Sequence, residues 1–286
     1  MYKRQDLHLH TTASDGLLTP ARMVREARLA GMNIIAITDH DTVSGVREAL
    51  DAGVREGVRV LPGLELSVGG EEEIHLLAYG VRPEHPGLLA LLEGLLVRRQ
   101  ARMEEMLRRL EALGMPVPRE EACAPDSPFM GRMNLARAMT ARGYCASPAE
   151  AFSRWLNAGR PAYVPKEPIG VPEGVRRLRA LGAVVCLAHP GRLRMEESAL
   201  LARLPGWTEA GLEGMEAYHP SHRDPERYAR MARRHGLLVT GGSDCHGRRG
   251  ERSWIGEATA GWHSAQEDVA ALQSRMTERI TKAESP

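Results

Sequence analysis

The sequence predicts an α/β fold, a sheet or a barrel, and two observations carry that prediction. Runs rich in apolar and β-branched residues alternate with segments of helical periodicity. Within the runs, successive positions are apolar, which is typical of parallel strands that helices cover on both faces. The expected strands are 33–38, 58–68, 74–80, 183–189, 211–218 and 237–243.

Helix signals lie between these runs. Thr19 is a suitable N-cap, Pro20 suits the first helical turn, and the pattern ARMVREARLAG ends at Gly31. Repeated alternation of strand and helix along the chain indicates an α/β sheet or barrel.

A helical block interrupts the alternation between about Pro83 and Pro161. Helices are expected over 88–113, 131–142 and 148–157, with a proline-rich loop over 116–128. A helical block inside an α/β chain is most simply an inserted subdomain. We therefore expect one α/β domain made of residues 1–82 and 162–286, and an inserted helical subdomain of residues 83–161.

Composition and charge exclude several classes of protein. The 286 residues are 43% apolar and 26% charged, which excludes wholesale disorder and provides for a large core. A net charge of +1 argues against a surface that coats nucleic acid. No window holds the ~18 apolar residues of a membrane helix, and MYKRQDLHLH lacks a signal-peptide core. Four cysteines without a CxxC pair fit a reducing cytoplasm, and we expect neither a membrane nor an obligate protein partner.

Histidine and carboxylate residues gather near the ends of the predicted strands. His8 and His10 lie two apart in DLHLH, so a strand presents both on one face. TDHD, PGLELS, AHPG and GGSDCHG place further donors in or after later strands, and His75 opens another strand. In α/β barrels, chemistry collects where loops leave the C-terminal strand ends. Imidazole with carboxylate suits Zn, Mn or Fe, and so large a set suits two or three ions bridged by a carboxylate such as Glu65.

The order of these motifs resembles the PHP family, named for its polymerase and histidinol-phosphatase members. The resemblance runs from DLHLHTTASDG through GGSDCHG, which is most of the chain. It implies a distorted (β/α)7 barrel with a trinuclear metal site at the strand C-termini. The implied ligand groups are His8, His10, Glu65 and Asp244; Glu65, His75 and His189; and Asp15, His40 and His246.

Within the family, the chain resembles the bacterial nucleoside 3′,5′-bisphosphate phosphatases, whose members also trim RNA from its 5′ end. The shared features are the helical insertion, GRPAYVPKE and AHPGRL. The resemblance implies that arginines of the insertion hold substrate phosphate, and Arg99, Arg102 and Arg132 fall at matching positions. Arg99 and Arg102 could form one anion clamp, although a solvated helix face has the same spacing. Asn134 stands where close relatives carry histidine, and its amide can donate to phosphate but cannot carry a proton.

The predicted reaction is metal-assisted hydrolysis of a phosphoester. Glu65 is expected at the catalytic centre between two ions, and Asp15 and His40 are expected to contact substrate as well as metal. His222 matches a histidine that many relatives carry and could protonate the leaving group, or it could be an ordinary loop histidine. The implied cofactors are two to three divalent ions, with Mn as the first expectation and Zn or Fe as the others.

The expected substrate is a nucleoside 3′,5′-bisphosphate, which would lose its 3′ phosphate and leave the 5′-monophosphate. Short RNA with a 5′ phosphate could be trimmed by the same arrangement, because its first 3′ phosphodiester would occupy the same place. Two alternatives remain open: a phosphatase for a small non-nucleotide such as histidinol phosphate, and a non-catalytic metal-binding accessory module. The helical insertion argues against the first, and the complete ligand set argues against the second.

Overall fold

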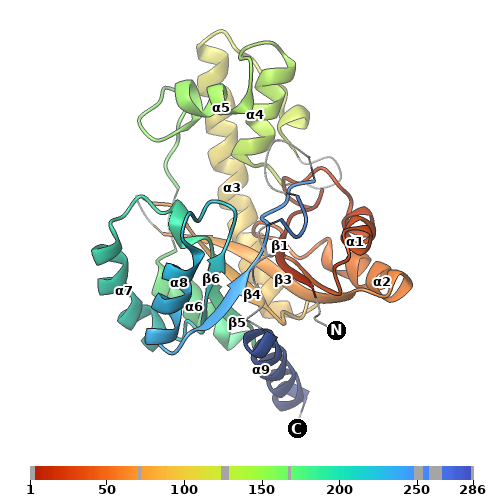
Figure 1. Cartoon of the computed structure of the whole chain (residues 1–286). Coiled ribbons are helices and arrows are strands. Elements are labelled where there is room, and N and C mark those ends of the chain that lie inside the picture. The colour runs from red at the N-terminus through yellow and green to blue at the C-terminus, as the bar shows by residue number, and fades with distance from the viewer. Residues whose placement is uncertain are drawn as a thin grey trace.

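Seven paired strands form the centre of the part of the chain that this computed structural model describes (Figure 1). The described residues are 4–69, 72–123, 129–166, 169–247, 254–257 and 266–284. The strands lie side by side in chain order. They are β1 (Gln5–Leu9), β2 (Ile34–Ile37), β3 (Arg59–Val68), β4 (Ile74–Tyr79), β5 (Val184–Leu187), β6 (Gly214–Tyr218) and β7 (Leu238–Gly241).

The sheet closes into a barrel just beyond its last strand. Leu9 of β1 forms a parallel bridge with Cys245, and the backbone N–H of His10 donates to the Cys245 carbonyl at 3.0 Å. The strand order, this closure and the helices around the sheet confirm the predicted distorted barrel of seven strands.

One strand runs against the predicted direction. β4 is antiparallel to both β3 and β5, whereas the other paired strands are parallel. The prediction of a parallel strand over 74–80 is therefore wrong. Residues 69–73 alone join β3 to β4, and a parallel crossover needs about a dozen residues or more. The reversal places the start of β4 at the edge where the parallel strands end.

Helices cover the outside of the barrel (Figure 1). They are α1 (Pro20–Leu29), α2 (Val46–Glu56), α6 (Val171–Ala180), α7 (Glu197–Ala210), α8 (Pro225–Arg234) and α9 (Gln266–Glu284). The predicted cap of α1 is confirmed, because the Thr19 side chain accepts from the Arg22 N–H at 3.3 Å. β6 starts later than predicted, at Gly214, because Gly211 has a φ of 109° and still belongs to the end of α7.

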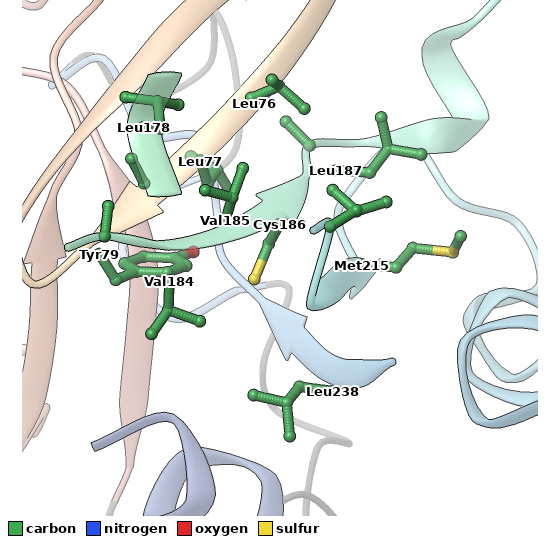
Figure 2. Close-up of a cluster of buried hydrophobic side chains, with 14 of the residues drawn as sticks. Leu76, Leu77, Tyr79, Leu178, Val184, Val185, Cys186, Leu187, Met215 and Leu238 are labelled. Carbon is green, nitrogen blue, oxygen red and sulfur yellow. The ribbon is translucent and has the colours of Figure 1, made fainter. Parts of the chain in front are cut away.

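The barrel core takes side chains from all parts of the barrel, and Figure 2 shows the portion around β4 and β5. Every residue of β5 is buried, as expected for a strand with neighbours on both edges and cover on both faces. Figure 2 shows Val185 and Leu187 of β5 beside Leu77 and Met215 of the adjoining strands. The buried Tyr79 hydroxyl donates to the Leu7 carbonyl at 3.0 Å, so the ring spans the barrel with its polar atom satisfied.

A second apolar core lies in the helical segment at the top of Figure 1. The segment contains α3 (Pro86–Ala112), the 3₁₀ turn η1 (Arg119–Ala122), α4 (Arg132–Ala141), α5 (Pro148–Ala151) and the π-helical turn η2 (Phe152–Leu156). The three predicted helices are confirmed, and positions 124–128 of the predicted loop lie outside the described residues. α3 belongs to both cores, because Leu88 packs in the barrel and Met103 packs in the helical segment. The division at residues 83 and 161 stays a prediction.

Two negative observations concern the described residues. Among their helices, none combines the length and apolarity that crossing a membrane requires. The four cysteines form no disulfide with one another. Cys245 is fully buried in an apolar cluster, and burial raises the pKa of its thiol to about 12, so it stays protonated at neutral pH.

Candidate metal centre

The Glu65 carboxylate lies at the centre of the histidine cluster and is fully buried near the end of β3. Its Oε2 atom is 3.3 Å from Nε2 of His8, 3.3 Å from Nε2 of His10 and 2.9 Å from Nδ1 of His40. His8 and His10 reach it together because they are two residues apart at the end of β1. A carboxylate oxygen among three imidazoles is well placed for a bridging ligand.

The second oxygen of Glu65 faces two more of the expected ligands. Oε1 is 2.8 Å from Nδ1 of His75 and 2.9 Å from Nε2 of His189. His189 follows β5, a strand that ends at the site. His75 instead lies near the start of β4, and it reaches the same place because β4 is antiparallel to its neighbours.

The remaining expected ligands complete the other side of the cluster. Nε2 of His246 is 3.2 Å from Oδ1 of Asp15, and Nε2 of His40 is 3.9 Å from the same oxygen. Oδ1 of Asp244 is 3.2 Å from Nε2 of His10. The structure therefore brings all nine sequence-predicted ligands into one cluster.

Strained backbone shapes three of the turns around this cluster. Among the described residues, positive φ outside glycine occurs at Asp41 (50°), His189 (25°) and Asp244 (52°). These residues follow β2, β5 and β7. Positive φ is unfavourable for residues that carry a side chain, and it persists where the surroundings over-determine it, often at binding sites.

The donor set fits divalent metal ions. Several buried site atoms lie close to one another without forming a hydrogen bond of normal geometry within the described residues, which is uncommon in folded proteins. They are Nε2 of His8, both ring nitrogens of His10, Oδ1 of Asp15, Nδ1 of His40, Oε2 of Glu65, Nε2 of His75 and Nδ1 of His189. Three sets have donor atoms within 4.8 Å of one another: His10, Asp15, His40 and His246; His8, His10 and Glu65; and His40, Glu65 and His75. Nitrogen with carboxylate oxygen is the chemistry of Zn, Mn and Fe sites.

Carboxylates and imidazoles of the cluster stabilise the charged forms of one another. Burial opposes ionisation of Glu65, but His75, His40 and His8 hold the pKa of its carboxyl well below the usual range. Burial likewise opposes a charged imidazole, yet Asp244 and Glu65 raise the pKa of His10 to about 9, and Glu65 raises that of His75 to about 9. Because a ligand imidazole must be neutral, metal uptake by the stripped protein must release protons.

His222 is held by backbone groups on both ring nitrogens. Its Nδ1 is 2.7 Å from the Ala217 carbonyl, and its Nε2 accepts from the Gly191 N–H at 2.9 Å. A Cβ atom at Gly191 would lie 2.4 Å from the His222 ring, which explains the glycine of AHPG. These contacts favour a role in positioning the turn after His189 over the proton transfer predicted for His222.

One pocket joins the cluster to the helical segment. It measures about 310 Å³ and is lined by Asp15, His40, Glu65, Glu73, His75, Arg99, Arg102, Arg132, His189, Arg192 and Asp244, among others. Arg192, after AHPG, donates to Oδ2 of Asp244 at 2.7 Å. The pocket is therefore lined both by candidate metal ligands of the barrel and by three guanidinium groups of the helical segment, those of Arg99, Arg102 and Arg132, which we call the arginine wall.

The two arginines of the predicted clamp differ in their partners. Arg99 donates to the buried carboxylate of Asp41, and its guanidinium lies 4.5 Å from the centre of the Phe129 ring. Arg102 donates from Nε to the Val164 carbonyl at 2.7 Å. Burial, together with the charge of Arg132, lowers the pKa of Arg102 to about 10. Arg102 is still charged at neutral pH. Because the Val164 carbonyl carries no net charge, this hydrogen bond does not neutralise the guanidinium, which can still attract a substrate anion.

Arg132 and Asn134, which are also predicted to contact substrate, lie on α4. Arg132 faces the pocket and forms an ion pair with Glu73. Asn134 is buried, and its Nδ2 donates to the Ser14 carbonyl at 3.4 Å. In this arrangement Asn134 supports the loop that carries Asp15. A contact between Asn134 and phosphate stays a prediction.

Sequence reasoning missed four polar residues at the site. Glu216 lies behind His8, and Nε2 of His219 is 3.5 Å from Oδ2 of Asp244. Glu73 and Lys166 form an ion pair at 2.5 Å beside the pocket. For Glu216 a signal existed, since a lone carboxylate in the apolar run GMEAY needs a buried partner.

Comparison with known proteins places the chain in a family. The PHP domain model matches residues 6–94. The chain is 32% identical over 249 residues to a 5′-3′ exoribonuclease of Haemophilus influenzae, covering 86% of this chain and 91% of that protein. It is 33% identical over 246 residues to a 3′,5′-nucleoside bisphosphate phosphatase of Chromobacterium violaceum, covering 84% and 86%. It is 34% identical over 260 residues to a phosphoribosyl 1,2-cyclic phosphate 1,2-diphosphodiesterase of Eggerthella lenta, covering 88% and 97%.

One solved structure is similar to this chain over nearly its whole length. The structure, from Bifidobacterium adolescentis, is described as that of a proposed metal-dependent phosphoesterase. It has a TM-score of 0.84 and 29% sequence identity, over 96% of this chain and 97% of that one. With the buried cluster of histidines and carboxylates, these matches show that the chain belongs to the PHP-domain family and is a metal-dependent phosphoesterase.

Proposed function

We propose that the protein hydrolyses the 3′ phosphate of nucleoside 3′,5′-bisphosphates and releases the 5′-monophosphate. One observation carries the proposal: the same pocket is lined by the candidate metal ligands and by the arginine wall of the helical segment. A substrate with two phosphates can use both groups of residues, whereas a substrate with one phosphate uses only one.

The cofactors in this proposal are two to three divalent ions, with Mn preferred and Zn or Fe as alternatives. The nine clustered side chains would hold them, with Glu65 between the two halves of the set. When bound, such ions polarise a phosphoryl oxygen and acidify a coordinated water.

The arginines have the role of fixing the phosphate that does not react. Arg102 donates to a backbone carbonyl and hydrogen-bonds no carboxylate of the described residues, so its positive charge is available to a phosphate. Arg132, on α4, lines the same pocket. Holding that phosphate would orient the 3′ ester over the metal centre and lower the entropic cost of reaching the transition state. Arg99, paired with Asp41 and packed on Phe129, shapes this wall.

Short RNA with a 5′ phosphate is the second proposed substrate. The relative from Haemophilus influenzae, an exoribonuclease, supports this extension. The first 3′ phosphodiester of the RNA would occupy the position that the 3′ phosphate takes in the nucleotide. The net charge of +1 offers little extended track for a longer polymer, so short oligonucleotides should react best.

The competing possibility is a small phosphoester that is not a nucleotide. The relative from Eggerthella lenta acts, by its name, on a cyclic phosphate of phosphoribose, and that name favours a small sugar phosphate. That compound still carries a second phosphate on its ribose, whereas histidinol phosphate is a small phosphoester with a single phosphate. Only histidinol phosphate would leave the arginine wall without a phosphate to hold.

Steady-state kinetics with Mn²⁺ separates these substrates. We expect the highest kcat/KM with adenosine 3′,5′-bisphosphate, a lower value with AMP and the lowest with histidinol phosphate. A highest value with histidinol phosphate or with a cyclic ribose phosphate would overturn the proposal. If the bisphosphate reacts and a 5′-phosphorylated trinucleotide does not, the phosphatase proposal stands and the RNA extension fails.

A further inference from the structure

The carboxylate of Glu73 occupies the cationic end of the pocket. Glu73 lies in the connection between β3 and β4, close to the proposed ligand His75. It accepts from Arg132 and from Lys166, the latter at 2.5 Å. The Glu73 carboxylate therefore pairs with one cation on α4 and with a second, Lys166, which follows the helical segment in the chain.

A smaller pocket of about 170 Å³ adjoins this position. Glu73 lines both pockets, as do Arg102, Arg132, Arg192 and Arg194, and Lys166 lines the smaller one. An anion that enters from the metal side and reaches toward the helical segment therefore meets a carboxylate among these cations. It must either stop short of Arg132 and Lys166 or take the place of Glu73.

We propose that Glu73 is a specificity-determining residue that competes with substrate for Arg132 and Lys166. The inference rests on the proposed function, because it concerns the phosphate that does not react. A remote group of the substrate gains binding free energy from Arg132 and Lys166 only if it attracts these two cations more strongly than the Glu73 carboxylate does.

Charge decides which groups can do so. A terminal phosphate monoester is close to a dianion at neutral pH, since its second pKa is about 6. A phosphodiester carries a single negative charge. Replacing the Glu73 carboxylate by a diester leaves the charge around Arg132 and Lys166 as it was, so nothing is gained. Replacing it by a dianion neutralises both cations, which favours substrates with a terminal phosphate.

The contact with His75 offers a different role for Glu73. Nε2 of His75 is 3.5 Å from Oε1 of Glu73, which is longer than a usual hydrogen bond. A carboxylate behind a ligand imidazole can orient it toward a metal. That role predicts a loss of bound metal and of kcat on every substrate when Glu73 is replaced, with no effect that depends on the remote group.

Three substrates test the proposal in the metal-loaded enzyme. Adenosine 3′-phosphate has no remote phosphate, its 5′-methylphosphate diester has a remote monoanion, and adenosine 3′,5′-bisphosphate has a remote dianion. Dividing each kcat/KM by that of adenosine 3′-phosphate in the same protein cancels effects on the metal centre. In the wild type, we expect a ratio of about one for the diester and a clearly higher ratio for the bisphosphate.

Glu73→Gln should raise both ratios by about three- to tenfold, as expected from losing one competing ion pair. Glu72→Gln is the matched control, since Glu72 lies beside Glu73 and accepts from the Arg194 N–H rather than from Arg132 or Lys166. Its ratios should follow the wild type. Metal content, measured for each variant, shows whether Glu73 instead orients His75 toward a metal ion.

The outcomes separate this inference from the proposed function. Ratios that fall or stay constant in Glu73→Gln overturn it, and a general loss of kcat and metal assigns Glu73 to His75 instead. If the wild type gains nothing from the bisphosphate but Glu73→Gln does, the competition is real and the proposed substrate is wrong. If neither protein gains from it, both proposals fail.

Discussion

Glu216 Oε1 lies 3.0 Å from Nδ1 of His8, and both side chains are fully buried. The contact turns Nε2 of His8 toward Glu65, at 3.3 Å. Glu216→Gln should lower metal affinity by about tenfold to a hundredfold, because the amide holds the imidazole less firmly and makes it a weaker donor. Calorimetric titration of chelator-treated protein with Mn²⁺ measures the affinity. The exposed Glu209→Gln serves as control, and equal affinities in the two variants would contradict the assignment.

Glu65→Ala tests the bridging position. Its two oxygens face imidazoles on opposite sides, so its loss should disturb more than one ion. We expect the variant to lose most of its bound metal and its activity while it remains folded. Metal analysis together with circular dichroism checks this, and sound activity in Glu65→Ala would exclude a bridging role.

The ligand set could be predicted from the sequence because short motifs carry it. His8 and His10 share a face of one strand, and residues such as His189 and Asp244 follow apolar runs that end at one edge of the barrel. His75 lies at the same edge because β4 is antiparallel to its neighbours, and the apolar pattern of residues 74–80 does not indicate the direction of the strand. The short connection before Ile74 already contained that information, because it excludes a parallel crossover.

Partners far apart in the sequence could not be predicted in this way. Glu73 and Lys166 are 93 positions apart, and Arg99 pairs with Asp41 across 58 positions. Neither pair has a spacing that indicates contact. Arg99 and Arg102 share a helix face, yet only the packed structure shows that one is paired with a carboxylate and the other is not.

Arg102→Ala and Arg99→Ala should therefore differ in their effects. Losing a charge-assisted contact of Arg102 should cost about 1.5–3 kcal/mol of phosphate binding, which raises KM for the bisphosphate about tenfold or more. Arg99→Ala leaves Asp41 buried without this partner and should mainly lower the free energy of unfolding, by about 3–5 kcal/mol. Kinetics and thermal melting separate the two.

Arg109→Ala is the matched control for Arg102→Ala. Arg109 lies on the same helix and also donates to a backbone carbonyl, that of Tyr163, but it is not among the residues that line the pocket. Its KM for the bisphosphate should stay at the wild-type value. An equal rise in KM for Arg109→Ala would show that the arginines act through the packing of α3.

The pH dependence of stability tests the role of His222. Burial lowers the pKa of His222 below 6.5, and its two backbone contacts require a neutral ring. Between the folded and unfolded pKa values the unfolded chain binds more protons, so stability is lost as the pH falls below 6.5. The stability advantage of the wild type over His222→Gln should therefore shrink between about pH 7 and pH 5.

A constant advantage across that range would contradict the positioning role of His222. Kinetics provides a second readout. A loss of kcat above a hundredfold in a fully stable His222→Gln would instead support proton transfer to the leaving group.

The identity of the phosphate released from adenosine 3′,5′-bisphosphate tests the central claim most directly. The Mn²⁺-loaded enzyme should release the 3′ phosphate and leave AMP with its 5′ phosphate, because the arginine wall holds that group away from the metal ligands. ³¹P NMR of the products distinguishes the two phosphates. Adenosine 3′-phosphate as the product, or an equal mixture of the two nucleotides, would contradict the account.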